Sequence, residues 1–176
     1  RSKYAESRKS DLIDIGIVKM SGHGLPPYPE VEKYPMDAKY LRPNHRPREG
    51  KNYVIVGYPH SKNRFDVVKN VVNVLPYAYR SDSIPENEYS KYGANPDKHI
   101  VLPLDRKVGF DSSGRRVNIP RPEGMSGSPV TVLYSDDNDS SRIFPVVGVG
   151  IEYRAKQKIL IATDVAYVAD AIRYAA

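Results

Sequence analysis

The sequence predicts a mostly β fold that ends in a single α-helix. Short apolar segments rich in β-branched residues recur along the chain, and Gly, Pro, Asn and Asp cluster between them, as is typical of strands joined by turns. Residues 163–173 place apolar side chains at helical spacing, with Thr163 or Asp164 available as a cap. Of the 176 residues, 40% are hydrophobic and 27% are charged, which indicates a globular protein.

The N-terminal part divides into two segments. Residues 11–20 are apolar and β-branched, so they predict a buried strand, in which Asp14 must be paired if it is buried. Asp14 either orients a catalytic base or faces solvent at the end of the strand. Residues 21–50 contain six prolines, which favours an extended linker along a surface and a boundary between two subdomains.

The rest of the chain predicts a series of strands. We expect a long loop over residues 77–97 and a β-hairpin that turns at residues 111–114. The alternation in residues 66–75 is imperfect and leaves a helix as an alternative to a strand there. The predicted strands cover residues 52–59, 66–75, 99–104, 130–134, 144–151 and 158–162.

Composition excludes several classes of function. The chain has no cysteine, so it has no disulfide and no thiolate metal site, and this favours a reducing compartment such as the cytoplasm. No apolar run is long enough to span a bilayer and no signal peptide is visible, so no membrane partner is expected. The net charge of +6 is scattered along the chain, so nucleic acid is not the expected partner. We expect no metal and no cofactor.

One stretch could carry chemistry, residues 123–130 with the sequence Glu-Gly-Met-Ser-Gly-Ser-Pro-Val. Ser126 lies between Gly124 and Gly127, and glycine allows backbone N–H groups to turn toward a bound carbonyl. A serine nucleophile needs such donors as well as a neighbouring base. The stretch is therefore either a nucleophile turn or a glycine-rich surface turn between two strands.

Several of these segments resemble the trypsin-like serine peptidases, the cysteine-free bacterial type in particular. Residues 124–129 are similar to the nucleophile motif of that family, G-x-S-G-G-P, with Ser128 in place of the second paired glycine. Residues 14–19 resemble the strand that carries the triad aspartate, residues 52–59 the strand that opens the second barrel, and residues 144–153 the strand that lines the substrate cleft.

The resemblance implies a chymotrypsin-like double β-barrel with a C-terminal helix, most of the first barrel being absent from this chain. Residues 1–22 would be the last strands of that barrel, 23–50 the interdomain linker, 51–162 the C-terminal barrel with the nucleophile loop, and 163–176 the helix. Ser126 would be the nucleophile, and the N–H groups of Gly124 and Ser126 the oxyanion hole. Asp14 would orient the catalytic histidine.

The sequence departs from the family in one respect. The catalytic histidine of the family precedes the aspartate, but His23, His45, His60 and His99 all follow Asp14. We therefore expect an upstream segment, beyond Arg1, to carry the first barrel and the histidine.

The expected function is a serine endopeptidase that cleaves a polypeptide substrate through an acyl-enzyme. Substrate-binding residues implied by the resemblance are Ile119 and Pro120 at the pocket floor, Gly150 and Ile151 on the cleft strand, and Glu152, which could supply a negative charge to the pocket. The alternatives are a catalytically inactive protease-fold module that binds a peptide or protein partner, and a nucleic-acid-binding protein that uses the scattered positive charge.

Overall fold

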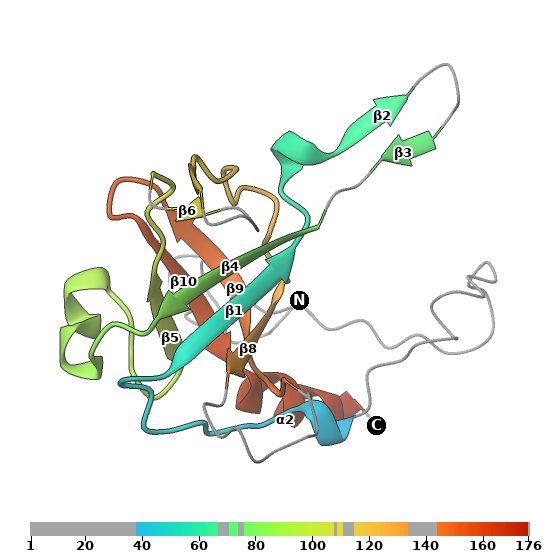
Figure 1. Cartoon of the computed structure of the whole chain (residues 1–176). Coiled ribbons are helices and arrows are strands. Elements are labelled where there is room, and N and C mark those ends of the chain that lie inside the picture. Colours follow the sequence, from blue (N-terminus) through green and yellow to red (C-terminus); the bar gives the residue numbers. More distant parts are fainter. Residues whose placement is uncertain are drawn as a thin grey trace, which may run out of the picture.

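A computed structural model of the chain (Figure 1) describes residues 38–66, 71–73, 76–107, 109–110, 115–133 and 144–175. The strand predicted at residues 11–20, with Asp14, lies outside the described residues, as do His23 and the first part of the proline-rich segment. The assignment of residues 1–22 to a first barrel is therefore outside them as well.

Six strands form one antiparallel sheet in the order β4-β1-β8-β9-β10-β5. The sheet curls so that its two edge strands, β4 and β5, approach each other. Two hydrogen bonds connect them: Ser81 Oγ donates to Pro103 O at 2.5 Å, and Ile84 N, just after β4, donates to Val101 O at 3.0 Å. The result is a curled half-barrel (Figure 1). Its strands are β1 (Asn52–Gly57), β4 (Tyr77–Asp82), β5 (His99–Pro103), β8 (Pro129–Leu133), β9 (Val146–Arg154) and β10 (Ile159–Asp164).

The inside of the curl is the main hydrophobic core. Tyr53 and Ile55 alternate with less buried residues along β1, and Val130 and Val132 do the same along β8, so each strand sends every second side chain inward. All four are fully buried, and burying a large apolar side chain contributes about 1.5–3 kcal/mol. The same cluster contains Tyr79, Ile100, Leu102, Leu104, Met125, Val147, Leu160 and Ala162.

A second, smaller core lies on the other face of β5 and β10. The 3-10 helix η3 (Glu86–Tyr92) covers this face, and its Tyr89 packs with Val101, Ile159 and Ile161. The hydroxyl of Tyr89 also accepts a hydrogen bond from Val101 N at 3.1 Å. Because β10 is covered on both faces, all six of its residues are buried.

A buried ion pair attaches the segment before β1 to the sheet. Arg48 Nη2 lies 2.7 Å from Asp164 Oδ2, and the two residues are 0% and 1% exposed. Asp164 Oδ1 accepts a hydrogen bond from Ala166 N at 2.9 Å and so caps helix α2 (Val165–Ala175). The same oxygen accepts from Asn44 N at 3.3 Å. One carboxylate thus joins the incoming segment, the end of β10 and the terminal helix.

The structure confirms most of the predicted elements from β1 onward. Strands lie at five of the six predicted places, the hairpin of β6 (Gly109–Phe110) with β7 (Arg116–Val117) forms, and α2 ends the chain with Asp164 as its cap. The coarse prediction of a mostly β fold with a C-terminal helix is therefore confirmed.

Three local predictions are wrong. A single strand over residues 66–75 is replaced by two short strands that pair antiparallel, β2 (Arg64–Asp66) and β3 (Val71–Asn73). The long loop over residues 77–97 is in fact strand β4 followed by η3, because charged residues on the solvent face concealed a half-buried strand. The described part of the linker does not only follow a surface, since it buries Arg48 and His45.

Replacing Arg48 with Leu should lower the free energy of unfolding by about 3–5 kcal/mol, because Asp164 would stay buried without its cation. The measurement is urea unfolding followed by tyrosine fluorescence. Arg46→Gln is the matched control, since the Arg46–Asp97 pair is exposed and should contribute less than about 1 kcal/mol. Equal losses in the two variants would contradict the anchoring role of Arg48.

Stability should fall when the pH drops below about 6.5, and His45 should account for part of that fall. Burial, followed by the nearby charges of Arg42, Lys51 and Arg48, holds the pKa of His45 below its usual 6.5, and Asp164 only partly opposes this. In that pH range the unfolded chain takes up a proton that the folded chain does not, so unfolding is favoured.

His45→Phe, which keeps a ring beside Tyr53, should flatten this dependence. The measurement is the urea midpoint at pH 7.5 and at pH 5.5. The same slope in the variant and the natural chain would exclude His45 as the source.

Candidate active site

The Ser126 loop is a compact double turn between Pro122 and Pro129. Met125 N donates to Pro122 O at 3.0 Å, and Ser128 N donates to Met125 O at 3.0 Å. Gly124 and Gly127 have φ angles of 89° and 91°, in the left-handed region that glycine adopts without strain. The two glycines on either side of Ser126 are therefore required by the backbone that the loop adopts.

The core and strand β9 fix the position of this loop. Met125 is 2% exposed and belongs to the main core cluster. On the other side, Gly127 N donates to Gly150 O at 2.8 Å, and Gly150 N donates to Ser128 O at 2.9 Å. Because a buried side chain and two strand-like hydrogen bonds hold the loop, Ser126 has a defined place despite its exposure.

A β-bulge in β9 meets the serine. The register with β10 passes from Ile161 opposite Glu152 to Ala162 opposite Gly150, so Ile151 is the extra residue. Ser126 Oγ donates a hydrogen bond to Ile151 O at 3.3 Å. The bulge thus supplies the carbonyl that orients the hydroxyl, while Ser126 stays exposed to solvent.

The two N–H groups predicted for an oxyanion hole are available. Within the described ranges, neither Gly124 N nor Ser126 N donates a hydrogen bond to a backbone or side-chain acceptor. The turn places His60 against Gly124, because His60 N donates to Glu123 O at 2.9 Å. A Cβ added to Gly124 would lie 3.1 Å from both His60 N and His60 Cβ, so this close approach also needs glycine.

Among the described residues, no side chain that could act as a general base is hydrogen-bonded to Ser126 Oγ. His45 and His99 are buried away from the loop, and His99 Nδ1 accepts a hydrogen bond from Asn95 N at 2.9 Å. His60 is exposed beside Gly124, but in the described part of the chain the only recorded partner of Ser126 Oγ is Ile151 O. Asp14 and His23 lie outside the described residues.

The predicted substrate-binding residues surround the loop but differ in exposure. Pro120 and Gly150 are buried, and Pro120 O accepts a hydrogen bond from Tyr79 OH at 3.3 Å. Ile119 packs against the main core cluster, and Ile151 against the smaller one. Glu152 is exposed, and its carboxylate lies 2.8 Å from Arg154 Nη2. Arg154 therefore already pairs with the negative charge that Glu152 was expected to supply to the pocket.

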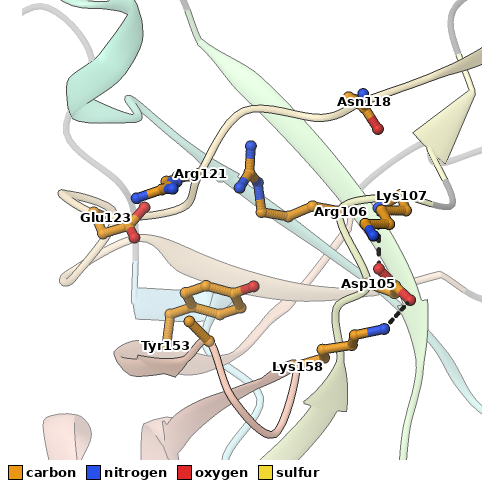
Figure 2. Close-up of a pocket in the computed structure, with 9 residues that line it drawn as sticks. Asp105, Arg106, Lys107, Asn118, Arg121, Glu123, Tyr153 and Lys158 are labelled. Carbon is orange, nitrogen blue, oxygen red and sulfur yellow. Dashed lines mark hydrogen bonds and ion pairs between the residues drawn. The ribbon is translucent and has the colours of Figure 1, made fainter.

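A cavity of about 420 Å³ lies next to the loop (Figure 2). In the view of Figure 2, Arg121 and Glu123 lie on one side of it, Lys107 and Lys158 on the other, and Arg106 and Tyr153 between them. The complete lining is Asp105, Arg106, Lys107, Asn118, Arg121, Glu123, Tyr153, Ala155 and Lys158.

The sequence did not predict this cavity. Of its lining residues, only Arg121, just before the serine loop, and Glu123, within it, are close enough to Ser126 in the sequence to suggest it. Arg106 comes from the turn after β5, and Lys158 from the turn between β9 and β10. The curl of the sheet brings these residues together, and no local sequence pattern predicts that curl.

The described residues contain no group of three or more His, Cys, Asp or Glu side chains placed to hold a metal ion. Over the same ranges, none of the helices has the length and apolar character that crossing a lipid bilayer requires.

Comparison of the sequence with models of known protein families and with curated proteins finds no match.

Replacing Gly57 with Ala should displace the serine loop. A Cβ at Gly57 would lie 2.1 Å from Ser128 Oγ and 2.8 Å from Met125 Cε, so both side chains must move within a packed region. We expect a loss of about 1–3 kcal/mol, typical of overpacking, measured by thermal unfolding.

Gly150→Ala is the matched control for this prediction. A Cβ there has its nearest contacts at 3.6 Å, which is ordinary van der Waals distance. We expect a smaller loss in this variant. A loss from Gly57→Ala no larger than that from Gly150→Ala would show that Gly57 does not position the loop.

Proposed function

We propose that the chain carries the nucleophile and the oxyanion hole of a trypsin-like serine endopeptidase. The observation that carries this proposal is the Ser126 loop, in which an exposed hydroxyl lies between two left-handed glycines and beside two N–H groups that have no protein acceptor in the described ranges. The six-stranded curled antiparallel sheet with a C-terminal helix supports it, because the barrels of that family have six antiparallel strands and a helix ends its chain.

In the proposed reaction Ser126 Oγ attacks the carbonyl carbon of a peptide bond. A histidine from an upstream segment takes the hydroxyl proton and passes it to the leaving amine, so that an acyl-enzyme forms. The N–H groups of Gly124 and Ser126 donate to the oxyanion of the tetrahedral intermediate. Water then attacks the ester and restores the free serine. Asp14 holds the histidine in the required tautomer.

A specific observation favours a second candidate, an inactive module that binds a peptide in the same place. In the described residues Ser126 Oγ donates to Ile151 O, and no imidazole accepts its proton. A protein of this second kind would bind peptides without hydrolysing them.

Labelling the folded full-length protein with a fluorophosphonate should give an adduct on Ser126, because only an activated serine reacts readily with this reagent. Mass spectrometry of a proteolytic digest locates the adduct. Ser126→Ala should abolish labelling and lower kcat/KM on a peptide substrate by about 10⁴-fold or more. Ser61→Ala, which removes another exposed serine, should label normally. No adduct on Ser126 in folded full-length protein would refute the peptidase and leave the binding module.

A further inference from the structure

The cavity beside the serine loop lies where a substrate side chain would enter. Arg121 directly precedes the loop, and Glu123 belongs to it. Tyr153 lines the cavity and lies two residues after Ile151, whose carbonyl accepts the hydrogen bond of Ser126. A peptide whose carbonyl lay on Ser126 would therefore have this cavity within reach of a neighbouring side chain.

The charge of the lining is predominantly positive. Four cationic side chains, Arg106, Lys107, Arg121 and Lys158, face two acidic ones, Asp105 and Glu123. Lys158 Nζ lies 2.7 Å from Asp105 Oδ2, so Asp105 is already neutralised, and this bond holds the pKa of Asp105 below its usual value. Glu123 alone remains to balance three cations. The cavity therefore disfavours a basic side chain and favours an acidic one.

Two arginines, Arg106 and Arg121, line this cavity. Arg106 Nε donates to Ile119 O at 3.1 Å, which fixes the side chain and leaves its terminal nitrogens for a ligand. In the described ranges no acidic residue lies within ion-pair distance of Arg106 or of Arg121. Arginine presents a planar fork of donors that matches a carboxylate. The ring of Tyr153 lines the same space, and burial raises the pKa of this phenol, so it stays neutral.

We propose that this cavity binds an acidic side chain of the polypeptide substrate, with Arg106 and Arg121 as the residues that determine specificity. The proposal rests on the proposed peptidase function. The preferred substrate residue is Glu or Asp immediately before the cleaved bond, because Arg121, which directly precedes the serine loop, and Glu123, which belongs to it, both line the cavity.

The first experiment compares hydrolysis of three acetyl-Ala-Ala-X p-nitroanilides by the full-length protein, with Glu, Gln or Lys as X. The ratio of kcat/KM for Glu over its isostere Gln should be about 10- to 100-fold, the range expected for hydrogen bonds to a charged group. Lys should be the poorest of the three. Arg121→Gln and Arg106→Gln should each lower the Glu-to-Gln ratio about tenfold.

Two further variants control for structure. Arg106→Lys keeps the positive charge, so it should retain part of the preference that Arg106→Gln loses. Arg173→Gln removes an exposed arginine on α2, away from this cavity, and should leave the ratio unchanged. An equal loss in Arg106→Lys and Arg106→Gln, together with an unchanged ratio in Arg121→Gln, would overturn the assignment.

The second experiment separates the two proposals. Calorimetric titration of the Ser126→Ala variant with acetyl-Ala-Ala-Glu amide and its Gln counterpart measures binding without catalysis. Tighter binding of the Glu peptide that Arg121→Gln abolishes supports the acidic pocket, even if no substrate is hydrolysed and the peptidase fails. Hydrolysis without preference for Glu overturns the acidic pocket and leaves the peptidase standing. Neither hydrolysis nor preferential binding overturns both.

Discussion

The carboxylate of Asp164 is the constraint on which the rest of the structure depends. Burying an ion costs several kcal/mol, and this cost is offset only where its oxygens are fully bonded. Arg48 neutralises one oxygen of Asp164, and the N–H groups of Ala166 and Asn44 donate to the other. The sheet, the terminal helix and the incoming segment are therefore fixed together at one point.

The position of the serine loop depends on the Asp164 carboxylate, because strand β9 connects the two. The anchored end of β10 pairs with β9, where Asp164 lies opposite Gly148 and Thr163 opposite Val149. The next residues of β9, Gly150 and Ile151, hold the backbone and the hydroxyl of the loop. Gly124 and Gly127 have positive φ angles that glycine adopts without strain. The loop can therefore place Met125 in the core without a cost in backbone energy.

The sequence predicted those parts of the fold that local pattern determines. Apolar runs bounded by turn residues correctly located β1, β5, β8, β9 and β10, and the capping residue correctly located α2. The sequence also drew attention to Gly124 and Gly127 around Ser126, and both have the positive φ angles that favour glycine.

Strand β4 was missed because polar and charged residues follow its two tyrosines, and only the curled sheet decides which side chains are buried. The basic cavity was missed for a similar reason. Arg106, Arg121 and Lys158 come from three separate connections between strands, and no spacing in the chain relates them. A local pattern also cannot predict the bulge at Ile151, since it is defined by how β9 pairs with its partner strand β10.

Different parts of the structure determine the position of the Ser126 hydroxyl and the charge of the cavity. The extra residue of the bulge, Ile151, fixes the hydroxyl of Ser126, whereas Arg106 and Lys158 reach the cavity from turns outside the loop. Changes in those turns can alter the charge of the cavity while the register of β9 stays the same. A scaffold of this kind could therefore acquire new selectivity by drift in surface turns, with the geometry around its serine preserved.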